Sequence, residues 1–152
     1  MQKVFVAGAT GYLGRFVGKE FKNRGYWIRA LARKQQQLEK TGRCLAPAVT
    51  EQVDEVFEGQ ASKPETLLGL CDGIDIVFTC IGITRQRDKV SFMDVDYRGN
   101  KILLSEAGKA DISKFIYVSV FNAENMEKLK SVTVWDAHCI IGYFSSSCNR
   151  RS

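Results

Sequence analysis

Along the chain, short apolar runs alternate with segments in which apolar residues recur every three or four positions. The first apolar run covers residues 3–7 and predicts a buried strand. Apolar residues then recur at helical spacing at Leu13, Phe16, Val17 and Phe21. Gly25 follows at the position of a helix C-cap. This order of strand, helix and strand is typical of βαβ units, which build parallel sheets.

The same alternation continues to about residue 120 and predicts further strands at residues 27–32, 52–57, 74–80 and 115–118. Between them, a polar stretch at 34–40 is expected to form a short helix. A longer helix is predicted from Ser62, an N-cap residue, through Pro64 in its first turn to about Leu70.

One further helix is predicted from Ser91 to about Lys109, because Ser91 and Asp94 fit a capping box. Its apolar positions Ile102 and Leu103 are expected to face the sheet, as is Val95. The predicted fold class is therefore α/β, a doubly wound parallel sheet in one domain.

Composition agrees with an ordinary globular protein: 45% of the 152 residues are hydrophobic and 26% are charged. No apolar run approaches the roughly 18 residues of a membrane span, and the early first strand leaves no room for a targeting segment. The five cysteines are scattered without Cys-x-x-Cys spacing, and there is one histidine, so we expect no metal site. Together these features predict a cytoplasmic protein with reduced thiols.

The net charge of +5 raises the question of nucleic-acid binding. The basic residues are spread along the chain, without a dense basic run that contains aromatic residues. We therefore expect a solvated surface that favours a small anionic ligand, and no nucleic-acid partner.

The segment GATGYLG contains three evenly spaced glycines, Gly8, Gly11 and Gly14, between the first strand and the first helix. Glycines at such a junction permit a tight turn, a close approach of phosphate oxygens to the backbone, and close packing of the helix. The amide groups that start the helix would then bind a pyrophosphate, with Thr10, Gly11, Tyr12 and Leu13 as the cradle. The spacing is G-x-x-G-x-x-G, so a tight turn without a ligand is the alternative, but the flanking strand and helix favour a dinucleotide.

The end of the second predicted strand indicates which dinucleotide binds. An acidic residue there would accept a hydrogen bond from the ribose 2′-hydroxyl, whereas this chain has Arg33 followed by Lys34. A guanidinium suits a 2′-phosphate, so NADP(H) is predicted over NAD(H). The alternative is that Arg33 is only a solvated residue after a strand.

Several segments together resemble the atypical short-chain dehydrogenase/reductases, in particular the NmrA-like and isoflavone-reductase-like NAD(P)-binding proteins. They are GATGYLG, RALAR, CIGITR and DVDYRGNKILLSEA followed by KFIYVSV, and the resemblance covers about residues 1–130. It implies a Rossmann sheet of order 3-2-1-4-5 with NADP(H) across the carboxyl ends of the strands.

The resemblance also implies roles for individual residues. Those that match the pyrophosphate loop, the 2′-phosphate reader and the loop over the adenine-side ribose are Gly8, Thr10, Gly11, Tyr12, Leu13, Arg33, Cys80, Ile81 and Gly82. Gln60 stands where relatives often have an acidic residue beside the adenine. Ser119 matches an active-site serine near the nicotinamide; the alternative is a strand-end hydroxyl bonded to local backbone.

Two features depart from the family pattern. Its reductases use a tyrosine with a lysine four residues later as proton donor, after the serine strand; here Tyr97 and Lys101 have that spacing but precede Ser119. We interpret this pair as structural. After about residue 131 the expected long helix and substrate-binding segment are not recognisable, and His138 has no partner.

Residues 1–131 are therefore predicted to form the NAD(P)-binding domain, and 132–152 a divergent tail. Either CIIGYF, residues 139–144, forms a short sixth strand, or the tail is foreign to the fold, as a truncated or frameshifted end would be.

Two functions follow from this reading. The first is an NADP(H)-binding Rossmann protein of reductase ancestry, which, if active, transfers hydride to a small carbonyl or alkene substrate. The second is a catalytically inactive NADP(H)-binding sensor or interaction protein. The sequence leaves the substrate and the oligomeric state open.

Overall fold

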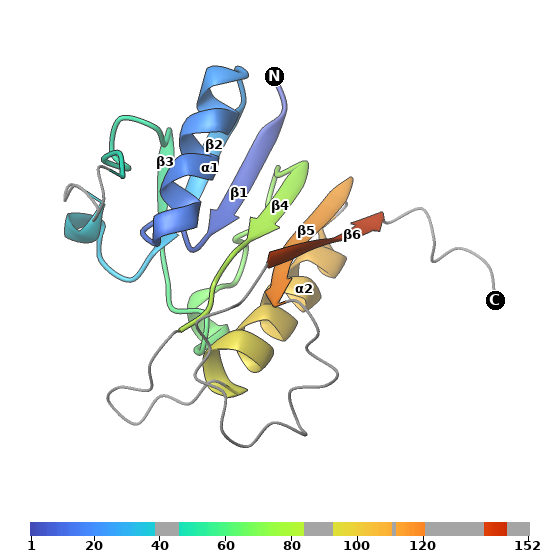
Figure 1. The fold of residues 1–152 in the computed structure, drawn as a ribbon. Coiled ribbons are helices and arrows are strands. Elements are labelled where there is room, and N and C mark those ends of the chain that lie inside the picture. The colour runs from blue at the N-terminus through green and yellow to red at the C-terminus, as the bar shows by residue number, and fades with distance from the viewer. Residues whose placement is uncertain (39–45, 84–92, 111, 121–138, 146–152) are drawn as a thin grey trace.

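A computed structural model describes residues 1–38, 46–83, 93–110, 112–120 and 139–145. Its centre is a sheet with strand order β3-β2-β1-β4-β5-β6 (Figure 1). The strands are β1 (Lys3–Ala7), β2 (Trp27–Ala32), β3 (Glu55–Glu58), β4 (Ile76–Thr79), β5 (Lys114–Val120) and β6 (Cys139–Ser145). The first five are parallel, so the predicted doubly wound Rossmann order is confirmed.

The sheet is covered by a helix on each side (Figure 1). On one face, Val17 and Phe21 of α1 (Tyr12–Asn23) pack against an apolar cluster that includes Val4, Val6 and Ile28. On the other face, α2 (Asn100–Lys109) packs against a second cluster, to which it contributes Leu103 and Ala107. Because both faces of β1 are covered, its run from Val4 to Ala7 is fully buried, which explains why it reads as continuously apolar.

The segment predicted as a helix from Ser62 to Leu70 is instead a short 3₁₀-helix, η2 (Pro64–Thr66), followed by turns. The Thr66 hydroxyl donates to the Lys63 carbonyl and accepts from the Gln60 amide, and such side-chain bonds compete with helix formation. Gly69 then takes a positive φ of 77°, which ends any helical path. Leu67 and Leu70 are nevertheless fully buried, so the segment still covers its part of the sheet.

Two other predicted helices are present in altered form. The expected short helix at 34–40 is a single 3₁₀ turn, η1 (Gln35–Gln37). The helix expected up to Lys109 begins as a π-helix, η3 (Met93–Gly99), and continues as α2. As predicted, Leu103 is buried in the core. Ser91, its expected cap, lies outside the described residues.

β6 contains the CIIGYF segment, so this segment forms the sixth strand that was one of the alternatives for it. It pairs antiparallel with β5, with Ser119 opposite Ile140. An apolar, β-branched segment placed beside the outer parallel strand satisfies the backbone groups that β5 would otherwise expose as a sheet edge.

Cys71 provides a pH-dependent test of the core. It is buried in the α2-side cluster, and burial, aided by the charge of Glu106, raises the pKa of its thiol to about 12. The unfolded thiol ionises near pH 8.5, so above that pH the unfolded state loses a proton that the folded state keeps, and stability falls.

We therefore expect the melting temperature of the wild type to drop more steeply between pH 9 and 11 than that of Cys71→Ala, measured by circular dichroism. Equal slopes for the two proteins would contradict the burial of this thiol. Below pH 8 the two curves should run parallel, with the variant lower by the small cavity it creates.

Candidate functional site

The turn after β1 leads directly into α1. Gly8 has a φ of 91°, and the Gly11 amide donates to the Gly8 carbonyl over 2.9 Å. Gly11 is the N-cap of α1, with no side chain bonded to the helix start and no acidic residue in the first turn. The amides of Tyr12, Leu13 and Gly14, which start the helix, thus have no intrahelical acceptor, and the positive end of the helix dipole is uncompensated.

α1 lies unusually close to this turn. A Cβ built on Gly14 would be 2.1 Å from the Gly8 carbonyl oxygen and 2.9 Å from the Ala9 Cα. Both obstacles are backbone atoms that side-chain motion cannot clear. A glycine is therefore required at position 14 for the helix to start where it does, as the sequence pattern predicted.

The loop after β4 packs on the other side of the turn. The Cys80 amide donates to the Ala7 carbonyl, and a Cβ on Gly8 would lie 2.9 Å from the Cys80 sulfur. Ile81 and Gly82 follow, and Gly82 is exposed with the Asp96 carboxylate beside it. The structure thus brings the predicted segments 8–13 and 80–82 together at the carboxyl edge of the sheet.

A polar network under the β4 loop was not found by sequence reasoning. The buried Thr79 hydroxyl donates to the Asn100 side-chain oxygen over 2.7 Å, and the Asn100 side-chain nitrogen, Nδ2, donates to the Asp96 carbonyl. The Asp96 carboxylate in turn accepts from the Ile83 amide over 3.2 Å, and burial raises the pKa of this carboxyl group. These bonds hold the loop to η3 and α2. Two of them join residues 21 and 13 positions apart, which no periodic pattern links.

Arg33 and Lys34 follow β2 and are exposed. The neighbouring strand ends in Glu58, whose carboxylate accepts from the Gln35 amide over 3.3 Å, so this carboxylate lies beside the start of η1. The side-chain amide of Gln60 donates to the Ser62 hydroxyl, which holds it within its own loop. The end of β2 therefore presents two cations with one carboxylate nearby.

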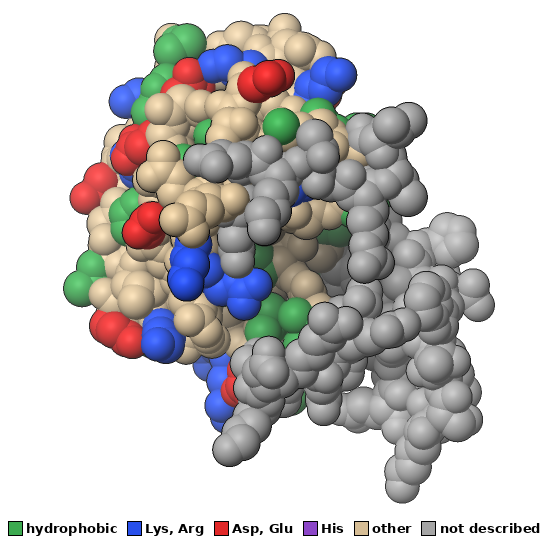
Figure 2. Space-filling model, turned by 90° about the vertical axis from the view of Figure 1, so that its left-hand side faces the viewer, with side chains coloured by type: hydrophobic (Ala, Val, Ile, Leu, Met, Phe, Trp, Pro, Cys, Tyr) green, Lys and Arg blue, Asp and Glu red, His purple; other side chains and the backbone are tan. Residues whose placement is uncertain are grey.

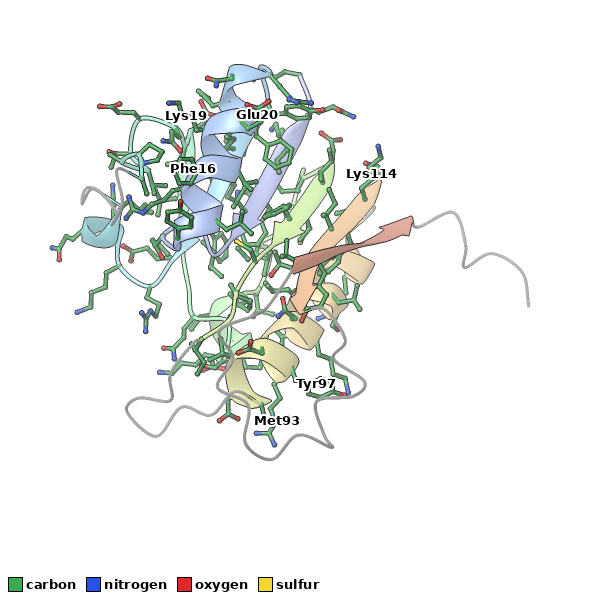
Figure 3. The ribbon with its side chains drawn as sticks, viewed as in Figure 1. Phe16, Lys19, Glu20, Met93, Tyr97 and Lys114 are labelled. Atoms are coloured by element: carbon green, nitrogen blue, oxygen red, sulfur yellow. The ribbon has the colours of Figure 1, made fainter. Side chains whose placement is uncertain are left out.

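The remaining residues singled out from the sequence are Ser119, Tyr97, Lys101 and His138. Ser119 is in β5, two residues past Tyr117, the partner of Thr79 at the end of β4, so its backbone lies at the same edge. The Tyr97 ring is exposed on η3, with the Lys101 ammonium 5.9 Å from its centroid, which is a cation–π arrangement (Figure 3). His138 lies outside the described residues.

The surface around β3 and η1 carries both signs of charge. Figure 2 shows basic side chains near the middle of this face and along its upper edge, with acidic ones among them. Among the residues described, no group of three or more His, Cys, Asp or Glu side chains is placed to hold a metal ion.

Comparison with known proteins decides the family. Residues 8–146 match the model of the NAD(P)H-binding family, which is most of the chain. The chain belongs to the NAD(P)H-binding family. Its matched region starts at Gly8, the first residue of the turn described above, and runs through β6.

Individual relatives of this NAD(P)H-binding chain are more distant. It is 30% identical over 135 residues to the photosystem II assembly factor Ycf39 of Cyanophora paradoxa, covering 86% of this chain and 39% of Ycf39. It is 34% identical to the uncharacterized sugar epimerase YhfK of Bacillus subtilis, covering 82% of this chain and 56% of YhfK. Among solved structures, the oxidoreductase ylbE of Lactococcus lactis is 25% identical with a TM-score of 0.61, over 86% of this chain and 54% of that one. The chain thus spans between about two-fifths and three-fifths of the length of these relatives.

The residues at the carboxyl edge fit the NAD(P)H that the family binds. The turn offers uncapped amides without a first-turn carboxylate, and its glycines allow the helix start and the Cys80 loop to pack closely against it. Backbone donors at a helix start suit a pyrophosphate regardless of the side chains present.

The Gly14 contact gives a test with an internal control. Gly14→Ala should lower the free energy of unfolding by about 2 kcal/mol or more, because backbone overpacking is costly. Gly108→Ala, in exposed α2 surface with no atom within 4 Å of the new Cβ, should be neutral or stabilising by up to about 1 kcal/mol. Urea unfolding measures both. Similar stabilities for the two variants would show that α1 does not start against the turn as described.

Proposed function

We propose that this chain binds NADP(H) at the carboxyl edge of its sheet, as a Rossmann domain of reductase ancestry. The observation that carries the proposal is the uncapped start of α1 at Gly11, pressed against a glycine turn that follows β1. Gly8, Thr10, Gly11, Tyr12 and Leu13 would surround the pyrophosphate, with the Tyr12 and Leu13 amides as donors, since the Gly11 amide already donates to the Gly8 carbonyl. Cys80, Ile81 and Gly82 would line the ribose on the adenine side, because their loop packs directly against Gly8.

The preference for NADP(H) over NAD(H) rests on Arg33. Its exposed guanidinium follows β2 at the position where a 2′-phosphate would lie, and Lys34 adds a second positive charge. The Glu58 carboxylate is already bonded to the Gln35 amide, which occupies one of its oxygens with a backbone donor. The proposal therefore assigns the net positive charge of this corner to phosphate recognition.

If the chain is active, bound NADPH would supply a hydride to a small carbonyl or alkene substrate. Ser119, at the carboxyl end of β5, would then orient the acceptor atom of the substrate from the edge that also carries the turn. The proton donor is not identified among the residues described, since Tyr97 and Lys101 lie on η3 and α2 before β5.

The second candidate is an NADP(H)-binding sensor or interaction protein that turns nothing over. The name of one relative, a photosystem II assembly factor, favours it, as does the position of the Tyr97–Lys101 pair ahead of β5. For either function we propose a cytoplasmic location, supported by the buried thiol of Cys71. Within the described segments, no helix has both the length and the apolar character that crossing a membrane requires.

Titration calorimetry with both nucleotides tests the proposed binding and its preference. The wild type should bind NADPH more tightly than NADH. Arg33→Asp should weaken the binding of NADPH by at least about tenfold, which corresponds to about 1.4 kcal/mol, and should weaken the binding of NADH much less. Lys19→Asp makes the same charge change on α1, farther along the helix, and should weaken both nucleotides only slightly. No heat with either nucleotide would refute the binding, and equal losses in Arg33→Asp would refute the preference.

A turnover assay separates the two functions. Oxidation of NADPH is followed at 340 nm with a panel of small quinones, aldehydes and enones, for the wild type and Ser119→Ala. An active reductase should consume NADPH with at least one substrate, and Ser119→Ala should lower kcat with little change in nucleotide affinity. Binding without any consumption across the panel would favour the sensor.

A further inference from the structure

Arg15 is a buried cation directly behind the glycine turn. It lies in the first turns of α1, and only 5% of its surface is exposed. The described residues place no carboxylate in an ion pair with it; its partners are backbone carbonyls. Burying a charge in this way is unfavourable unless hydrogen bonds compensate, so its position calls for a reason beyond packing.

Its guanidinium joins two segments that the sequence separates. Nε donates to the Thr10 carbonyl over 3.1 Å, and Nη1 donates to the Pro47 carbonyl over 2.8 Å. The backbone amide of the same residue donates to the Gly11 carbonyl, as the first helical bond of α1. Arg15 is thus bonded to two successive carbonyls of the turn, one through its side chain and one through its backbone.

These bonds set the direction of the neighbouring amides. In a planar trans peptide, the carbonyl and the following N–H point in opposite directions. Because the Thr10 carbonyl points at Arg15, the Gly11 N–H points away from it, toward the Gly8 carbonyl that it binds. Because the Gly11 carbonyl points into the helix, the Tyr12 N–H points out of it, toward the edge where the pyrophosphate is proposed to bind.

We infer that Arg15 is a positioning residue for the anion-binding turn: it fixes the Thr10–Gly11 peptide and ties the turn to the segment at Pro47. That segment is itself held to η1 by the Val49 amide, which donates to the Leu38 carbonyl. The inference rests on the proposed function for its ligand, NADP(H) or NAD(H). Since both nucleotides carry the same pyrophosphate, loss of Arg15 should weaken the binding of NADPH and of NADH alike. Loss of Arg33 is instead expected to weaken mainly the binding of NADPH.

The first arm of the test uses the ligand-free protein. Amide hydrogen exchange at Gly11, measured by NMR, should be at least about tenfold faster in Arg15→Gln, because its bond to Gly8 is no longer held in place. Arg24→Gln is the matched control, on the same helix with an exposed guanidinium paired to Glu20, and it should leave Gly11 exchange unchanged. Unchanged exchange in Arg15→Gln would overturn the inference.

The second arm measures dissociation constants for NADH and NADPH by calorimetry, at a temperature where circular dichroism shows every variant to be folded. Arg15→Gln should weaken the binding of both nucleotides by about tenfold, which corresponds to about 1.4 kcal/mol. Arg24→Gln should leave the binding of both unchanged. Arg15→Lys, which keeps the charge but reaches one carbonyl only, should fall between. A merely structural role would lower the melting temperature and leave the constants of the folded protein unchanged.

Wild-type binding with unchanged constants in Arg15→Gln would overturn the inference, as would a loss confined to NADPH. If the wild type binds neither nucleotide, the proposed function fails, and the exchange arm alone still decides whether Arg15 orders the turn. If Arg15→Gln does not fold, Arg15→Lys carries both arms, and wild-type values for it in both would count against the inference.

Discussion

The contact between Gly14 and the Gly8 carbonyl determines how the rest of this structure is arranged. It allows α1 to begin after a turn of only four residues that follows β1, so the helix start faces the carboxyl edge of the sheet. A side chain at position 14 would push the helix away from β1 and from the apolar cluster that Val17 and Phe21 reach. The same backbone contact therefore sets both the packing of one face and the position of the uncapped amides.

The edge of the sheet is organised on both sides of this turn by polar groups that are satisfied from within the protein. Arg15 holds the turn from behind through the Thr10 carbonyl, and Asn100 holds the β4 loop through Thr79 and the Asp96 carbonyl. Because the Thr10 and Gly11 carbonyls are bonded inward, the Tyr12 amide that follows is left to point outward. A backbone arranged in this way suits an anion before any side chain is considered.

Membership of the NAD(P)H-binding family and the sheet order establish what kind of domain this is, but not which reaction it serves. The relatives that it resembles are longer, and their names range from an epimerase to an assembly factor. β6 pairs antiparallel with β5 and is the outer strand on that side of the described sheet. The proposed reductase and the proposed sensor share the same nucleotide edge and differ only in what lies beside Ser119.

The sequence by itself determined the parallel strands and the glycine turn, because buried parallel strands need continuous apolar runs and a helix packed on a turn needs glycine. The order of the strands was implied by the family resemblance and is confirmed by the structure. It mispredicted the helix at 62–70, where the Thr66 hydroxyl and Gly69 act locally against a helical pattern. Only the tertiary structure revealed the roles of Arg15 and Asn100, since their partners are backbone carbonyls or residues far along the chain. A hydrogen bond to a distant carbonyl leaves no periodic trace in a sequence, whereas burial and backbone crowding do.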